Sequence, residues 1–251
     1  MEYNKILQGD CLEVMPNIPD KSIDMILCDL PYGTTACKWD TIIPFEPLWK
    51  EYKRIIKDNG AIVLTASQPF TSALVMSNIK MFKYEWIWKK NAGSNFATTK
   101  YQPMKEHENI LIFANGKTKY NQQRQVRAES GFARQKTPLR FDRYQEDGIY
   151  GNILDKVIHK RITKDRCPSS VQSFNRERGL HPTQKPVALF EYLIKTYTNK
   201  GDLVLDNCAG SGTTGVACKN LGRNYILIEK EKKYVEIVRD RIKAIPELLF
   251  K

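Results

Sequence analysis

A glycine-rich turn between two short apolar runs limits the possible folds of this chain more than any other feature. The turn begins at Asp206, after the apolar run 203–205, and carries Gly210, Gly212 and Gly215 in the spacing G-x-G-x-x-G. A segment with helical character follows, and then a second apolar run. A strand, a tight turn, a helix and a second strand in this order are typical of a βαβ unit in a parallel sheet.

The acid that ends the second apolar run gives this unit a candidate ligand. Residues 225–228 lead into Glu229, about twenty residues after the glycines, where nucleotide-binding units place their ribose-binding acid. Glycines let a ligand approach the backbone closely, and a carboxylate can accept both ribose hydroxyl protons. The pattern predicts a nucleoside cofactor, and the alternative is a tight helix entry with Glu229 as a surface cap.

The nucleoside can belong to NAD or to S-adenosylmethionine. The turn lies near the C-terminal end, which leaves no room for the second mononucleotide half of an NAD site. Asp206 also suits a cationic cofactor better than a pyrophosphate. S-adenosylmethionine is therefore favoured, with an NAD-dependent oxidoreductase as the alternative.

Strand-like and helix-like segments alternate through the first half of the chain and again near its end. We expect strands at 3–9, 23–28, 61–65, 84–89 and 109–113, and helical segments at 11–18, 44–57, 69–79 and 187–197. Asn59-Gly60 is expected to end the helix at 44–57. The alternation predicts an α/β fold with a mostly parallel sheet covered by helices on both faces.

The strand predicted at 23–28 ends in the sequence Asp29-Leu30-Pro31-Tyr32. Pro31 fixes its own φ and holds Leu30 in an extended conformation. The Asp29 carboxylate and the Leu30 carbonyl can then accept two N–H bonds from a flat heterocycle with an exocyclic amino group, while Tyr32 stacks on its face. The alternative is a strand-ending turn in which Asp29 is a local cap.

Positive charge is concentrated in one segment. The net charge is +12, and residues 115–185 carry sixteen Lys or Arg against seven Asp or Glu, an excess of nine. Such a concentration predicts contact with nucleic acid, although a solvated face is the alternative. Between about 115 and 179 the hydrophobic pattern has no steady period, and a loop of this length favours an inserted functional subdomain.

The cysteines and the apolar runs restrict the environment of the protein. The six cysteines never form C-x-x-C, so we expect reduced thiols and no metal site. No apolar run approaches the roughly 20 residues that a bilayer requires. The N-terminal sequence MEYNKILQGD lacks a signal-peptide pattern, and a cytoplasmic location without membrane contact is expected.

Four motifs together resemble the beta class of amino-group DNA methyltransferases. D-L-P-Y at 29–32 looks like the family's D-P-P-Y, and D-N-C-A-G-S-G-T-T at 206–214 looks like D-P-F-x-G-S-G-T. H-P-T-Q-K-P at 181–186 matches a family signature, and Gly9-Asp10 resembles its G-D pair. The catalytic motif precedes the cofactor motif, which is similar to the circularly permuted order of this class. The resemblance covers roughly 4–113 and 181–243.

The resemblance implies methyl transfer from S-adenosylmethionine to an exocyclic amine of a base flipped out of double-stranded DNA. It implies a catalytic motif of Asp29, Leu30, Pro31 and Tyr32, and cofactor contacts by Asp10, Lys185, Asp206, Asn207, Gly210, Gly212, Thr213 and Glu229. The implied fold is a Rossmann-like methyltransferase with a catalytic half at 1–114, a target-recognition insertion at 115–180 and a cofactor-binding half at 181–251. Aspartate rather than serine at the head of the motif favours adenine N6. A cytosine-N4 or RNA amino-methyltransferase and a catalytically inactive nucleic-acid-binding module are the alternatives.

The middle segment is implied to read the target sequence. Candidates for phosphate and guanine contacts are Arg124, Arg127, Arg134, Arg140, Arg143, Lys160 and Arg161. The implied partners are double-stranded DNA, a second copy of the chain and a cognate restriction endonuclease.

Two departures from the family motifs affect the cofactor and target sites differently. Leu30 replaces a proline, but the expected contact uses a carbonyl, which any residue provides. Asn207 and Cys208 replace Pro-Phe and remove an aromatic ring that would pack near the cofactor adenine.

Overall fold

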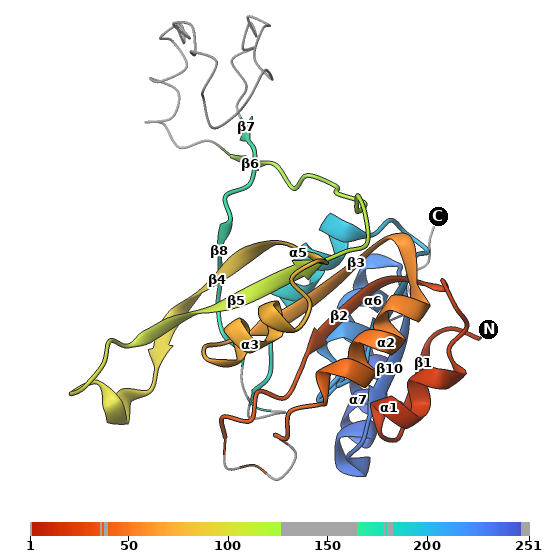
Figure 1. Ribbon diagram of the computed structural model, residues 1–251, viewed down its shortest axis with the longest axis horizontal. Coiled ribbons are helices and arrows are strands. Elements are labelled where there is room, and N and C mark those ends of the chain that lie inside the picture. Colours follow the sequence, from red (N-terminus) through yellow and green to blue (C-terminus); the bar gives the residue numbers. More distant parts are fainter. Residues whose placement is uncertain are drawn as a thin grey trace, which may run out of the picture. The chain divides into compact units, whose positions relative to one another are not determined.

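The structure is a computed structural model that describes residues 2–35, 37, 40–126, 165–177, 179 and 183–246. Two compact units divide the chain: Met1–Asn121 with Ser169–Lys251, and Gln122–Pro168. The larger unit contains an eight-stranded sheet with helices against it (Figure 1). In the smaller unit, β6 (Gln125–Val126) and β7 (Asp165–Arg166) pair antiparallel.

The strands and helices of the larger unit follow the expected alternation. Its strands are β1 (Lys5–Gln8), β2 (Ile23–Asp29), β3 (Ile56–Ala66), β4 (Phe82–Ser94), β5 (Lys105–Phe113), β8 (Val171–Phe174), β9 (Leu203–Asp206) and β10 (Asn224–Glu229). Its helices are α1 (Cys11–Val14), α2 (Phe45–Ile55), α3 (Phe70–Ser77), α5 (Val187–Tyr197), α6 (Thr213–Leu221) and α7 (Lys232–Ala244), with 3-10 turns η1 (Met15–Asn17) and η2 (Phe96–Thr98). Among the helices described, none has both the length and the apolar character to cross a membrane.

The strand order reverses between β2 and β9. The sheet runs β1-β10-β9-β2-β3-β5-β4-β8, and the five strands from β1 to β3 are parallel. From β2 the chain passes through α2 to β3 on one side, whereas from β9 it passes through α6 to β10 on the other (Figure 1). Open α/β sheets bind ligands at the carboxyl ends of strands that flank such a reversal. The fold therefore brings the ends of β2 and β9 together as a candidate site.

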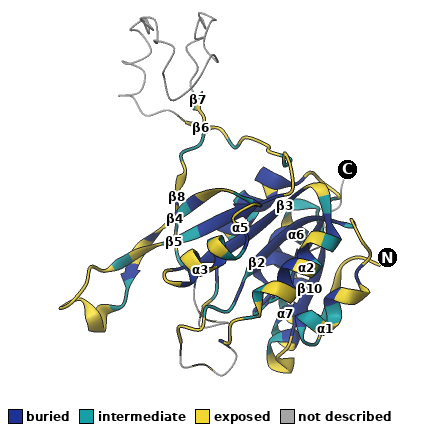
Figure 2. Cartoon of the chain, viewed as in Figure 1, coloured by how far each residue is buried: buried dark blue, intermediate teal, exposed yellow. Residues whose placement is uncertain are grey.

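Alternate residues of the central strands pack into two separate cores. Ile26 and Cys28 of β2 belong to the cluster covered by α1, α2 and α3. Met25 and Leu27 belong to the cluster covered by α5, α6 and α7. Figure 2 shows the resulting dark-blue strands between the two helical layers. The α/β class and the mostly parallel, doubly covered sheet are confirmed, and β5 adds antiparallel pairs with β3 and β4.

One predicted helix boundary is wrong. Asn59-Gly60 does not end α2, because the helix stops at Ile55 and both residues lie inside β3. Ile56 pairs with β2, and the register then shifts so that the next pairs begin at Ala61. The intervening residues form an irregularity of the strand, which uses the same Asn-Gly sequence that commonly follows a helix.

Candidate active site

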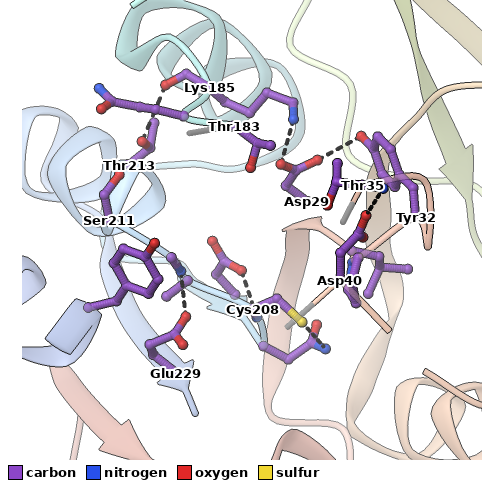
Figure 3. A pocket seen from close by; sticks show the side chains of 18 of the residues that line it. Asp29, Tyr32, Thr35, Asp40, Thr183, Lys185, Cys208, Ser211, Thr213 and Glu229 are labelled. Carbon is purple, nitrogen blue, oxygen red and sulfur yellow. Dashed lines mark hydrogen bonds and ion pairs between the residues drawn. The ribbon is translucent and has the colours of Figure 1, made fainter. Parts of the chain in front are cut away.

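A cavity of about 1180 Å³ opens at the carboxyl ends of β2, β9 and β10 (Figure 3). It is lined by most of the residues predicted for the catalytic motif and the cofactor site, namely Asp10, Asp29, Leu30, Pro31, Tyr32, Lys185, Asp206, Asn207, Gly210, Thr213 and Glu229. The structure thus gathers residues from both ends of the sequence around one space. Gly212 lies in the turn but does not line the cavity.

Asp29 lies at the end of β2 with both carboxylate oxygens engaged. Tyr32 donates a hydrogen bond to Oδ1 at 2.7 Å, and Thr65 of the neighbouring β3 donates a second one to the same oxygen. Lys185 donates to Oδ2 at 2.5 Å. Thr65 was missed in the sequence because its position beside Asp29 depends on the register of β2 against β3.

Tyr32 is held rigidly as one wall of the cavity. Its ring stacks on Phe70 of α3, with centroids 5.1 Å apart and an interplanar angle of 24°. Burial raises the pKa of Tyr32 well above its usual value, and the negative charge of Asp29 adds to this effect. The hydroxyl therefore stays protonated and donates to Asp29, while stacking of Tyr32 on a base remains a prediction.

Asp29 begins a chain of alternating charges whose two lysines, Lys185 and Lys90, are buried. Beyond its bond to Asp29, Lys185 Nζ lies 3.5 Å from Glu108 Oε2, and Lys90 Nζ lies 2.5 Å from Glu108 Oε1. Burial alone lowers the pKa of Lys185, but the charges of Asp29 and Glu108 outweigh it and raise the pKa. Burial alone raises the pKa of Glu108, whereas the two lysines lower it overall.

Lys185 was predicted to contact the cofactor, and in the structure its side chain reaches the predicted catalytic motif. Its ammonium lies at Asp29, at the end of the cavity opposite the glycine turn, as Figure 3 shows. A cofactor contact by Lys185 remains a prediction. Glu108 and Lys90 were not singled out in the sequence, because nothing in the runs around β4 and β5 indicates which polar side chains face inward.

The side chain of Asp40 stabilises the loop that follows Tyr32. Its carboxylate accepts hydrogen bonds from the backbone N–H groups of Gly33, Thr34 and Thr35 at 2.9, 2.9 and 2.7 Å. Burial raises the pKa of Asp40, but a hydrogen bond from the Thr35 side chain and these backbone bonds oppose it and leave the pKa below its usual value. Asp40 therefore shapes the cavity wall beside the catalytic motif. In the sequence, an aspartate a few residues after Gly-Thr-Thr is only a weak indication that its carboxylate binds the backbone of that loop.

The glycine turn and the acid of β10 are joined directly. Gly210 donates its backbone N–H to Glu229 Oε2 at 2.7 Å, and Glu231 donates its own to Oε1 at 2.8 Å. Burial raises the pKa of Glu229. Gly212 has φ +80°, and a Cβ at this position would lie 2.7 Å from Val238 Cγ1 of α7. The turn therefore passes too close to α7 for any residue with a side chain.

Asp206 ends β9 as a buried carboxyl group at the base of the cavity. Its side chain accepts a hydrogen bond from Thr214 and one from the Cys208 backbone N–H at 3.1 Å. Burial raises its pKa to about 7, although these bonds oppose the rise. The adjacent Asn207 accepts a hydrogen bond from Tyr52 at 2.6 Å and so ties the turn to α2.

Asp10 and Thr213 have structural partners as well as positions on the cavity wall. Asp10 caps α1 by accepting a hydrogen bond from the Leu12 N–H at 3.0 Å, and it pairs with Lys230 at 3.2 Å. Thr213 donates to the Lys185 carbonyl at 3.3 Å. Their cofactor contacts remain predictions.

The predicted DNA-contacting residues fall mostly outside the described part of the chain. Arg124 is exposed in the smaller unit and forms an ion pair with Asp165 at 2.6 Å. The other candidates and the histidine of the H-P-T-Q-K-P motif lie outside the described residues: Arg127, Arg134, Arg140, Arg143, Lys160, Arg161 and His181. DNA contact by this set remains a prediction.

Comparison with protein families identifies the chain. A model of N6/N4 methyltransferases, described as DNA methylase, matches residues 23–240. The chain belongs to the N6/N4 DNA methylase family. This result confirms the resemblance drawn from the four motifs, and the matched range contains both the D-L-P-Y motif and the glycine turn.

Curated relatives of this DNA methylase match nearly the whole chain. The type II methyltransferase M.HinfI from Haemophilus influenzae is 30% identical over 274 residues, which cover 96% of this chain and 69% of the relative. M.HpaI from Haemophilus parainfluenzae is 28% identical over 95% of this chain and 74% of its own length. M2.MboI from Moraxella bovis is 29% identical over 97% of this chain and 89% of its own length.

Solved structures share the fold. M1.HpyAVI, determined as a complex with S-adenosylmethionine, is 25% identical and aligns with a TM-score of 0.62 over 96% of this chain and 99% of its own. PvuII DNA methyltransferase, described as cytosine-N4-specific, aligns with a TM-score of 0.67 over 98% of this chain and 89% of its own. Its identity is 15%, so the likeness concerns the fold alone.

Proposed function

We propose that this DNA methylase transfers a methyl group from S-adenosylmethionine to the exocyclic N6 amino group of adenine in double-stranded DNA, after the adenine is flipped out of the helix. The observation that carries the proposal is the meeting of two motifs in one cavity. The Asp29 motif at the end of β2 faces the glycine turn after β9 across the reversal of strand order. The family membership supports the DNA substrate.

The methyl donor is S-adenosylmethionine, and the residues of the cavity fit it. Asp206 and Asp10 line the same space and provide carboxyl groups for a cationic ligand. Glu229 lies at the end of the strand where ribose hydroxyls are bound in this type of unit. The solved relative M1.HpyAVI was determined with S-adenosylmethionine. When bound, this cofactor supplies the electrophilic methyl group.

Asp29 and Leu30 prepare the nucleophile in this proposal. The Asp29 carboxylate and the Leu30 carbonyl accept the two N–H bonds of the amine, which directs its lone pair toward the glycine-turn end of the cavity. Tyr32, fixed against Phe70, contacts the face of the base. Most of the rate enhancement then comes from positioning rather than from covalent catalysis by the protein.

Cytosine N4 is the second candidate target, because both amines present two N–H groups to the same acceptors. The matching family model covers both N6 and N4 methyltransferases, which keeps this candidate open. An RNA amino-methyltransferase and a catalytically inactive binding module are further alternatives. A homodimer, a cognate restriction endonuclease and a cytoplasmic location remain predictions.

Methyl transfer from labelled S-adenosylmethionine to unmodified DNA, and in a parallel reaction to RNA, tests the proposal. Sequencing that detects modified bases then maps the target and its context. We expect N6-methyladenine within one short recognition sequence. Label on cytosine N4, on RNA alone or on no nucleic acid would reject the adenine assignment in favour of the corresponding alternative.

Replacement of Asp29 tests the catalytic site. Asp29→Ala should lower the methyl-transfer rate by at least about 100-fold, because the amine loses a charged acceptor that orients it. Duplex binding, measured by fluorescence anisotropy, should stay close to wild type. Glu46→Gln in α2, away from the cavity, is the matched control and should keep full activity. An active Asp29→Ala enzyme would refute the site assignment.

A further inference from the structure

The acceptor proposed for the target amine is already occupied by donors of the protein itself. Asp29 Oδ1 accepts hydrogen bonds from Tyr32 and Thr65, and Oδ2 accepts one from Lys185. Two donors already fill Oδ1, so an incoming amine must approach Oδ2, where the Lys185 ammonium lies 2.5 Å away. Tyr32 is stacked on Phe70 and Thr65 lies on a central strand, whereas the Lys185 ammonium sits on a flexible four-carbon stem. Lys185 is therefore the donor that can leave.

A second acceptor for Lys185 lies within reach. Glu108 Oε2 is 3.5 Å from Lys185 Nζ, is buried, and makes no hydrogen bond to any residue that the structure describes. A charged hydrogen bond of this kind forms at about 2.7–2.9 Å. A small movement of the ammonium away from Asp29 would complete a bond to Glu108.

Charge balance favours this exchange over release of Lys185 into water. Asp29 and Glu108 are negative, Lys90 and Lys185 are positive, and the four are connected by ion pairs. Lys185 is only 6% exposed, and a buried ammonium without a carboxylate partner is strongly unfavourable. Glu108 lets Lys185 leave Asp29 while it stays paired within the cavity wall.

We propose that Glu108 is a positioning residue that accepts Lys185 from Asp29 when the target base enters. Before the base arrives, Lys185 occupies the position of the amine and holds Asp29 in place. After the exchange, Asp29 Oδ2 is open to the exocyclic N–H group. This inference rests on the proposed function, because it requires an amine at Asp29.

Glu108→Gln tests the exchange because it keeps the shape of the side chain and removes its charge. Lys185 then has Asp29 as its only carboxylate partner in the group, and the group gains one net positive charge. We expect the methyl-transfer rate to fall by about ten- to a hundredfold, as for other small misplacements of reacting groups, with unchanged affinity for S-adenosylmethionine. Glu106→Gln, an exposed position of the same strand, is the control and should behave as wild type.

A second substitution separates the exchange from a structural role of Glu108. Adding Lys185→Met to Glu108→Gln removes the ammonium that blocks Asp29 and restores the net charge of the group. At a saturating concentration of S-adenosylmethionine, so that a weaker cofactor affinity does not limit the rate, the double variant should be at least tenfold faster than Glu108→Gln. A double variant no more active than Glu108→Gln would overturn the inference.

Binding to matched duplexes gives an independent measurement. The wild-type affinity for a duplex with adenine at the mapped target position is measured relative to that for a duplex with an abasic site, where no base has to be unstacked. Glu108→Gln should weaken binding of the adenine duplex relative to the abasic duplex, because the base can no longer displace Lys185. An affinity ratio equal to that of wild type would overturn the exchange alone. A wild-type enzyme that methylates no DNA would overturn the proposed function and, with it, this inference.

Discussion

Asp206 connects the buried base of the cavity to a measurable pH dependence. Burial raises its pKa to about 7. A cationic cofactor favours the ionised carboxylate, so binding below pH 7 must first remove a proton from Asp206. Affinity for S-adenosylmethionine should therefore fall as pH falls through 7, by about tenfold between pH 8 and pH 6 for a single linked proton. Isothermal titration calorimetry over this range measures it.

Asp206→Asn is the matched variant for this prediction. The variant keeps the size of the side chain but cannot ionise. Its affinity for S-adenosylmethionine should be lower than that of wild type at pH 8, and the tenfold fall between pH 8 and pH 6 should be absent. The amino group of the cofactor titrates in the same way with both proteins, and the difference between the two pH profiles isolates Asp206. Parallel profiles would show that Asp206 does not contact the cation.

Single residues were predictable from the sequence where a motif fixed their neighbours. Asp29 and Glu229 each follow an apolar strand, and their placement at strand ends needs no knowledge of the sheet. Thr65 and Glu108 could not be found in this way. Each reaches the group around Asp29 from a different strand, and strand register sets that proximity.

At the level of elements, the glycine turn depends on close contact between its backbone and α7. Gly212→Ala should destabilise the fold by more than the roughly 1–2 kcal/mol that a left-handed conformation costs a residue with a Cβ. The added Cβ would also lie 2.7 Å from Val238 Cγ1 and push the turn away from α7. Affinity for S-adenosylmethionine should fall as well, because the turn lines the cavity through Gly210.

Gly201→Ala separates the two costs. Gly201 has φ +83°, similar to Gly212, but no atom lies within 4 Å of a Cβ built there. Urea unfolding should show a loss close to the conformational cost alone, with unchanged cofactor affinity. Equal losses of stability in the two variants would contradict the predicted role of the contact with α7.

Elements were predicted best where the apolar period was long and bounded by clear signals. The helix expected at 187–197 coincides with α5, and the strand at 23–28 with β2 apart from its last residue. The prediction that Asn59-Gly60 ends a helix was wrong, because the same residues occur at helix ends and at strand irregularities. Only the pairing of Ile56 with β2 decides between them.

At the level of the whole molecule, strand order rather than any single motif creates the candidate active site. The sequence predicts that Asp29 and Asp206 end two parallel strands, but it does not reveal which strands are neighbours. In the structure β2 and β9 pair directly, with Ile26 opposite Leu205. This pairing joins the two ends of the chain and places both motifs at the reversal of strand order. Spacing along the chain carries no such information.

The division into two units predicts that DNA recognition can be separated from cofactor binding. Residues 122–168 carry eleven Lys or Arg against six Asp or Glu. Replacing them with a short Gly-Ser linker should leave thermal stability and S-adenosylmethionine affinity close to wild type. Duplex affinity should fall at least tenfold, and its dependence on salt should become weaker, because fewer phosphate contacts release fewer counterions. Fluorescence anisotropy at several salt concentrations measures both.

A longer deletion of residues 115–179 should behave differently, because its ends belong to the larger unit. Lys119 forms ion pairs with Asp24 at 3.0 Å and Asp202 at 2.6 Å, and β8 pairs with β4. Removing them leaves the buried Asp24 with fewer partners and exposes an edge of the sheet, so thermal stability should fall. If the shorter deletion instead lost cofactor affinity and kept duplex affinity, the smaller unit would not be the DNA-recognition segment.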